Sequence, residues 1–124
     1  MTKKSRLLYV DDEPINVVFF ELNFKSDFDV ITAKNGQEGL DILARQPVDF
    51  IVSDYKMPGL NGVDFLKTAH EKYGRKPSII LSGYDKNEHI IEALEAEQIV
   101  AYLTKPMDRN MILNIIKNQL PDHF

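Results

Sequence analysis

The sequence contains no cysteine, which excludes disulfide bonds and thiolate metal ligands. It also lacks a long hydrophobic run, because no stretch approaches the roughly 20 apolar residues that a membrane-spanning helix needs. The basic N-terminus is followed by the four apolar residues 7–10 and then by three acids, and so short an apolar run does not make a secretory signal peptide. We therefore expect a soluble, cytoplasmic protein that does not enter a membrane.

Positive charge is also scarce. Fifteen Lys and Arg residues stand against nineteen Asp and Glu residues, which gives a net charge of −4. That balance does not predict a nucleic-acid-binding surface, so we expect no direct contact with nucleic acid. The chain of 124 residues is 44% apolar, which is long and apolar enough for a sizeable core. With no repeat, linker or low-complexity tract in view, we expect one domain over residues 1–124.

Short apolar runs, several of them rich in β-branched residues, alternate with longer segments of helical periodicity. We predict strands at Leu7–Val10, Asp29–Ala33, Phe50–Ser53, Ser78–Leu81 and Val100–Leu103. The first intervening segment begins with Pro14, which suits a first helical turn, and then carries a stripe at helical spacing made of Ile15, Val18, Phe19 and Leu22. Asp85 and Glu88 resemble a capping box that would open the fourth helix.

Five strands that alternate with five helices predict a doubly wound α/β fold, in which helices cover both faces of a parallel sheet. Right-handed crossovers leave few topologies, and we expect the strand order 2-1-3-4-5. In such sheets, sites form beyond the carboxyl ends of the strands, where the strand order reverses. The residues that follow each strand are therefore the candidates for function.

Polar or charged residues follow all five predicted strands, and Lys34 and Asn35 follow the second. Asp11, Asp12 and Glu13 follow the first strand and Asp54 the third, while Ser82 follows the fourth and Lys105 the fifth. Each alone is more often a helix cap or a turn residue. Because all would meet at one edge of the sheet, we expect carboxylates, a hydroxyl and a lysine to converge there.

Converging carboxylates call for a cation. Two of them about 4 Å apart repel by roughly 4 kcal/mol at an effective dielectric constant of about 20. The candidate ligands are all oxygens, and the histidines lie away from the strand ends. Mg²⁺ is the ion that such a set prefers, and Mn²⁺ would also fit. A carboxylate beside Mg²⁺, a lysine and a hydroxyl also suits phosphoryl transfer, with Asp54 as the nucleophile.

Four motifs in this order resemble the receiver domain of two-component response regulators, chemotaxis-type regulators among them. They are VDDE at 10–13, DYKMPGLNG at 54–62, LSG at 81–83 and YLTKP at 102–106, and the resemblance covers roughly residues 6–120. Any one of them is weak, but together they are specific. The resemblance implies a flavodoxin-like fold and a part in two-component signal transduction or a phosphorelay.

The resemblance also implies a role for each matching residue. Asp54 would be the phosphoacceptor, taking its phosphoryl group from a phosphohistidine on a sensor histidine kinase or phosphotransfer protein. Asp11, Asp12, Asp54 and the backbone carbonyl of Lys56 would hold Mg²⁺. Lys105, before a cis bond to Pro106, would contact the phosphoryl group. Ser82 would hydrogen-bond a phosphoryl oxygen, and Tyr102 would be the aromatic residue that swings inward with it.

As the resemblance has it, phosphorylation would switch the surface of the fourth helix, fifth strand and fifth helix to control a downstream effector domain or protein. The protein would catalyse its own phosphoryl transfer and autodephosphorylation without being a turnover enzyme in the usual sense. The chain ends at NQLPDHF, so it either acts alone or is a piece of a longer protein. The fifth-helix stripe Ile112, Ile115, Ile116 and Leu120 could support a homodimer or could be core.

Three other functions remain to be weighed. A haloacid-dehalogenase-type phosphatase needs a second acid two residues after its nucleophile, and Lys56 stands at that position; Glu13 stands two residues after Asp11, but the chain has no room for the usual cap. In an FMN carrier the first loop should bind phosphate, which DDEP at 11–14 would repel. A pseudo-receiver that only binds a partner usually lacks one of the acids or the lysine, and this chain has them all.

Overall fold

Five short strands form one parallel sheet within residues 4–83 and 87–121, the part of the chain that the computed structural model describes. They are β1 (Arg6–Val10), β2 (Asp29–Ala33), β3 (Phe50–Asp54), β4 (Ser78–Ser82) and β5 (Ala101–Thr104). The order β2-β1-β3-β4-β5 confirms the predicted topology. Each predicted strand lies within one residue of the observed one. Asp54 and Ser82, expected just after their strands, are the last residues of β3 and β4.

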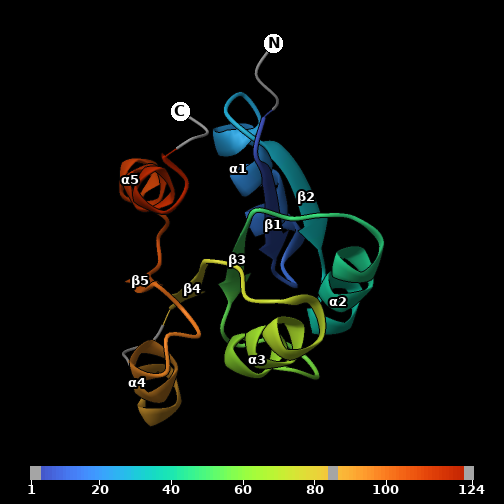
Figure 1. Cartoon of the computed structure of the whole chain (residues 1–124). Helices are drawn as coiled ribbons and strands as arrows, with labels where there is room; N and C mark the ends of the chain where they lie inside the picture. The colour runs from blue at the N-terminus through green and yellow to red at the C-terminus, as the bar shows by residue number, and fades with distance from the viewer. Residues whose placement is uncertain (1–3, 84–86, 122–124) are drawn as a thin grey trace.

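Five helices lie in the described ranges: four connect successive strands, and the fifth follows β5. They are α1 (Pro14–Phe24), α2 (Gly36–Arg45), α3 (Gly62–Tyr73), α4 (Glu88–Glu95) and α5 (Arg109–Gln119). Helices α1 and α5 cover one face of the sheet, and α2, α3 and α4 cover the other (Figure 1). The side chain of Asn87 caps α4 by accepting a hydrogen bond from the Ile90 N–H. The predicted capping residue, Asp85, lies outside the described residues. None of the described helices has the length and hydropathy that crossing a membrane would require.

The two faces of the sheet are packed with different side chains. The layer under α1 and α5 is rich in rings, and we call it the aromatic layer: Tyr9, Phe20, Phe24, Phe28 and Phe50 pack there with aliphatic residues of β3, β4 and α5. Tyr9 and Phe20 stack in parallel with ring centroids 4.0 Å apart. The layer under α2, α3 and α4 is mostly Leu, Ile, Val and Ala, with Phe65 as its one fully buried ring among the described residues, and we call it the aliphatic layer.

Helix α1 forms where the sequence predicts it, but it turns the other side to the sheet. Its stripe at helical spacing faces solvent, with exposed fractions of 81%, 57%, 54% and 61% for Ile15, Val18, Phe19 and Leu22. Phe20 and Phe24 are fully buried instead. These two are also one helical turn apart, so periodicity favours neither side. In this orientation the Phe20 ring stacks on Tyr9 and packs against Phe24, so both rings of α1 join the aromatic layer.

The stripe of helix α5 belongs to the core. Ile112 and Ile116 are fully buried in the aromatic layer, and Ile115 and Leu120 pack against it. Of the two interpretations that the sequence left open for this stripe, the structure therefore supports core packing. A homodimer through α5 would have to use other residues.

Candidate functional site

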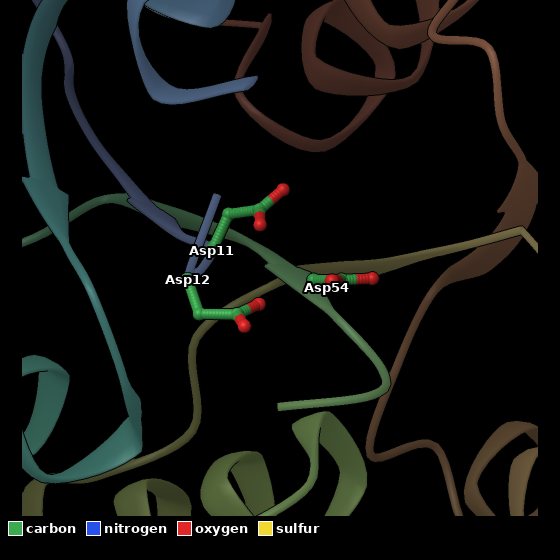
Figure 2. Close-up of side chains that lie close together, drawn as sticks. All are labelled: Asp11, Asp12 and Asp54. Carbon is green, nitrogen blue, oxygen red and sulfur yellow. The ribbon is translucent and has the colours of Figure 1, made fainter. Parts of the chain in front are cut away.

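The ends of β1 and β3 bring the acidic residues together. These neighbouring strands pair in register, with Val10 opposite Ser53, so Asp11 and Asp54 follow at the same level of the sheet. Asp11, Asp12 and Asp54 each offer an oxygen within 4.8 Å of the others. Figure 2 shows Asp11 and Asp12 leaving the end of one strand together, with Asp54 across from them. The three carboxylates form one cluster at the carboxyl edge, as the sequence predicts.

Lysine 105 completes this cluster with a positive charge. Its Nζ lies 3.2 Å from Asp54 Oδ1 and 3.7 Å from Asp11 Oδ2. The Lys105 N–H donates to the Ser82 carbonyl over 2.8 Å, which ties the residue after β5 to the end of β4. The Lys105–Pro106 peptide bond is cis, which confirms that expectation. One lysine thus faces two buried carboxylates, while the Asp12 side chain is exposed.

The charges of this site shift one another's pKa values. Burial raises the pKa of the Asp54 carboxyl group to about 6, with Lys105 opposing the shift and Asp11 adding to it. Burial by itself would lower the pKa of Lys105, but the charges of Asp54 and Asp11 outweigh it and raise that pKa. Near neutral pH, Asp54 is therefore mostly ionised, and the ammonium group beside it stays charged.

Asp11 is fully buried and is held by three donors that the sequence analysis did not consider. Its Oδ1 accepts the Glu13 N–H at 3.0 Å. Its Oδ2 accepts the Tyr9 hydroxyl at 2.6 Å and the Asn16 side-chain amide at 3.1 Å. Burial, reinforced by the bond to Asp11, raises the pKa of Tyr9, so the phenol keeps its proton. Tyr9 and Asp11 are two residues apart, a spacing that puts both on one face of a strand, but this spacing alone does not predict that the Tyr9 hydroxyl donates to Asp11.

The loop after Asp54 is anchored by backbone contacts. The Tyr55 N–H donates to Asp54 Oδ1 at 2.9 Å, and the Gly62 N–H donates to the Tyr55 carbonyl at 2.7 Å. A Cβ atom on Gly62 would overlap the Asp54 carbonyl oxygen and lie 2.8 Å from Ile80 Cδ1. Only a residue without a side chain lets α3 begin this close to the end of β3. Lys56 in this loop is exposed, and a metal-binding role for its carbonyl stays a prediction.

The two predicted switch residues lie on adjacent strands beside this cluster. Ser82 is buried at the end of β4, one residue beyond Leu81, which pairs with Asp54 across β3 and β4. Tyr102 on β5 is half-buried and packs against the aliphatic layer. Their places fit the predicted roles in binding a phosphoryl oxygen and in switching, which stay predictions.

The fold and this site together define a class of protein: a doubly wound α/β domain with an oxygen-only acidic cluster and a lysine at the carboxyl edge of its sheet. A family model described as the response regulator receiver domain matches residues 7–117. The chain therefore belongs to the receiver-domain family of response regulators, which confirms the resemblance seen in its motifs.

Similar proteins fall into two groups by length. The hydrogenase transcriptional regulatory protein HoxA of Cupriavidus necator is 33% identical over 115 residues, covering 93% of this chain and 24% of HoxA. Sporulation initiation phosphotransferase F of Bacillus subtilis is 29% identical over 117 residues, covering 94% of each chain. The chain thus spans about a quarter of the transcriptional regulators it matches and nearly all of the shorter relative.

Solved structures share the whole fold. A CheY-like response regulator receiver domain protein from Methanospirillum hungatei superposes with a TM-score of 0.88 at 25% identity, covering 98% of this chain and 97% of its own. The response regulator TrrA of Thermotoga maritima, solved in complex with Mg²⁺-BeF, gives a TM-score of 0.80 at 25% identity, covering 94% and 99%. The likeness extends over both layers and the edge that carries the site.

Proposed function

We propose that this protein is a phosphorylatable receiver, in which Asp54 accepts a phosphoryl group from a phosphohistidine on a sensor histidine kinase or phosphotransfer protein. The observation that carries this proposal is the pairing of Asp54 with Lys105 at 3.2 Å inside a cluster of three carboxylates. A pseudo-receiver usually lacks one of these groups, and here all of them meet at one edge of the sheet.

The residues at this edge fit a magnesium ion. The donor set consists of carboxylate oxygens within 4.8 Å of one another, two of them on buried residues, with one lysine to balance their charge. Asp11, Asp12, Asp54 and the backbone carbonyl of Lys56 would hold Mg²⁺, or Mn²⁺ in its place. When bound, the ion would neutralise negative charge on the oxygens of the phosphoryl group.

The chemistry assigns a separate task to each side chain. Both described donors to Asp54, the Tyr55 N–H and the Lys105 ammonium group, bind Oδ1, so we expect Oδ2 to attack phosphorus. A P–O bond forms, the P–N bond of the phosphohistidine breaks, and the departing imidazole takes a proton from solvent. Lys105 and the Ser82 hydroxyl would then bind phosphoryl oxygens. The receiver would catalyse this step, and later hydrolysis of the acyl phosphate, on itself alone.

Phosphorylation would then bias an equilibrium between two arrangements of α4, β5 and α5, with Ser82 and Tyr102 linking the site to that surface. The Tyr55 hydroxyl, which lies 3.2 Å from His89 Nδ1 on α4, would provide a second link. The output would be a downstream effector domain or protein. A homodimer through this surface would rest on exposed Ile91 and Met111, and size-exclusion chromatography with and without phosphorylation tests it.

Intact-mass spectrometry tests the proposed function directly. The protein is incubated with acetyl phosphate and Mg²⁺, beside the variants Asp54→Asn and Asp64→Asn. We expect one phosphoryl adduct in the wild type and in Asp64→Asn, none in Asp54→Asn, and none after chelation of the metal. If neither acetyl phosphate, phosphoramidate nor a cognate kinase gives an adduct, the protein is a pseudo-receiver and the proposal is wrong.

A further inference from the structure

We infer that Tyr9 is a positioning residue for the metal site, because its hydroxyl holds the buried carboxylate of Asp11 in the orientation that binds Mg²⁺. This inference rests on the proposed function, since it assumes that Asp11 helps to hold the ion. Tyr9 does not itself touch the metal or the phosphoryl group. It acts through the 2.6 Å hydrogen bond from its hydroxyl to Asp11 Oδ2.

The packing of Tyr9 fixes where its hydroxyl lies. The residue is 2% exposed, and its ring stacks in parallel on Phe20 with centroids 4.0 Å apart. Phe20 is packed in turn against Phe24, with centroids 4.6 Å apart. A phenol held in this way cannot turn toward solvent, and β-strand geometry places it on the same face as Asp11. The hydroxyl is therefore a pre-positioned donor, in the way that a packed supporting shell fixes a site.

Asp11 depends on such a donor more than its neighbours do. Its side chain is fully buried, whereas Asp12 is exposed and can exchange its partners for water. The bonds from Tyr9 and Asn16 both go to Oδ2, and Oδ1 accepts the Glu13 N–H. These bonds on both oxygens leave the carboxylate little freedom to rotate. The bond from Tyr9 is the shortest of the three, and hydrogen bonds to a charged acceptor are the stronger kind.

The hydrogen-bond partners of a metal ligand commonly affect how tightly the metal binds. Removing such a partner typically lowers metal affinity 10- to 100-fold, because the ligand loses its orientation. Asn16 and the Glu13 N–H would remain on Asp11 after loss of the Tyr9 hydroxyl. We therefore expect an effect near the lower limit, about a tenfold weaker affinity for Mg²⁺.

The test is Mg²⁺ binding by isothermal titration calorimetry to the unphosphorylated protein, as wild type, Tyr9→Phe and Tyr73→Phe. Phenylalanine keeps the ring that stacks on Phe20 and removes only the hydroxyl. Tyr73, at the end of α3, is partly exposed and remote from the cluster, so it controls for loss of a phenol as such. We expect the dissociation constant to rise about tenfold in Tyr9→Phe and to stay unchanged in Tyr73→Phe.

Three other outcomes would overturn the inference. Equal Mg²⁺ affinity in Tyr9→Phe and wild type would make Tyr9 a packing residue only. Tighter binding by Tyr9→Phe would mean that its hydroxyl competes with the ion. Absence of binding by the wild type would remove the metal site from the proposed function as well, so the two failures are distinguishable.

A second measurement uses the wild type alone and does not depend on how the variant folds. A buried hydroxyl proton in a short bond to a carboxylate should give a slowly exchanging, downfield proton resonance, assigned by its nuclear Overhauser contacts with the ring protons of Tyr9. We expect this resonance to persist at saturating Mg²⁺, because the bond stays in place while the ion is held. Its disappearance on addition of Mg²⁺ would show that the ion displaces Tyr9, against the inference.

Discussion

The aromatic and aliphatic layers reach the same functional site by different means. The aromatic layer contacts the site through a side chain, because Tyr9 stacks on Phe20 and its hydroxyl donates a hydrogen bond to Asp11. The helices over the aliphatic layer contact the site through the backbone, because Gly62 at the start of α3 lies against the Asp54 carbonyl group. In both cases a position deep in the packing contacts one residue of the pair that faces Lys105, through the side chain of Asp11 or through the backbone of Asp54.

This difference indicates how each layer should respond to substitution. A large ring that fills a layer leaves a cavity when it is truncated. A close approach of two backbones leaves no room for even one added methyl group. We therefore expect the aromatic layer to be sensitive to loss of volume and the aliphatic layer, near the site, to be sensitive to gain of volume.

Two adjacent phenylalanines of α1 give the largest expected contrast. Phe20 is fully buried and Phe19 is 54% exposed, so Phe20→Ala and Phe19→Ala remove the same atoms from opposite sides of one helix. We expect Phe20→Ala to lower the free energy of unfolding by about 4 kcal/mol, because a buried ring is lost and a cavity remains. We expect Phe19→Ala to lower it by less than about 1 kcal/mol. Urea denaturation measures both, and similar losses would refute the orientation of α1.

Adding a methyl group at Gly62 should have the next largest effect. In Gly62→Ala the new Cβ would meet the Asp54 carbonyl oxygen, so the backbone must move, which we expect to lower the free energy of unfolding by about 2–3 kcal/mol. Gly83→Ala is the matched control, since a Cβ there would have nothing within 4 Å. Chemical denaturation of both variants decides the point. A Gly62→Ala protein as stable as wild type would mean that α3 need not approach β3 so closely.

Neutralising Asp54 should stabilise the metal-free protein in a pH-dependent way. The pKa of Asp54 is about 6 in the folded protein against an ordinary value of 3.8, so folding favours the protonated form. The folded state thus binds more protons between about pH 4 and pH 6, and stability falls as the pH rises through that window. Such a shift corresponds to at most about 3 kcal/mol above pH 6. Asp54→Asn also loses its pairing with Lys105, so we expect a net gain of about 1–2 kcal/mol.

The measurement for Asp54→Asn is urea denaturation at pH 4.0, 6.0 and 8.0 with a chelator present. We expect the gain over wild type at pH 8.0 to shrink toward pH 4.0, where the folded wild-type carboxyl group is protonated and the unfolded one, with its ordinary pKa of 3.8, has begun to take up its proton. Asp64→Asn, on a partly exposed side chain of α3, provides the control. A gain that does not depend on pH would mean that burial of Asp54 carries no charge penalty.

The sequence was sufficient to predict the sheet and the gathering of its acidic residues. Strand signals are short apolar runs bounded by polar residues, and parallel pairing then forces Asp11, Asp54, Ser82 and Lys105 to one edge. Such positions follow from topology alone, without knowledge of any side-chain packing. Topology thus predicted a cluster of carboxylates that calls for a cation, while the particular ligand set, with the carbonyl of Lys56, followed from the resemblance to receiver domains.

The orientation of α1 and the role of Tyr9 could not be predicted in this way. The helix is apolar on both sides, so hydrophobic periodicity fits Ile15 and Leu22 as well as Phe20 and Phe24. Tyr9 stands inside an apolar run, so the pattern predicts that its ring packs in the core and gives no indication of a partner for its hydroxyl. Both depend on how large side chains share volume in three dimensions, which a one-dimensional pattern does not contain.

A substitution on the exposed side of α1 should change the free energy of unfolding least. It also tests directly which side of that helix faces the sheet. Leu22 is 61% exposed, so Leu22→Gln removes little buried area, and we expect the free energy of unfolding to change by less than about 0.5 kcal/mol. Urea denaturation at two protein concentrations measures this. A loss above about 1 kcal/mol that grows with protein concentration would mean that a second copy of the chain covers this side, since association stabilises only the folded state. The same loss at both concentrations would place Leu22 in the core and reverse the orientation of α1.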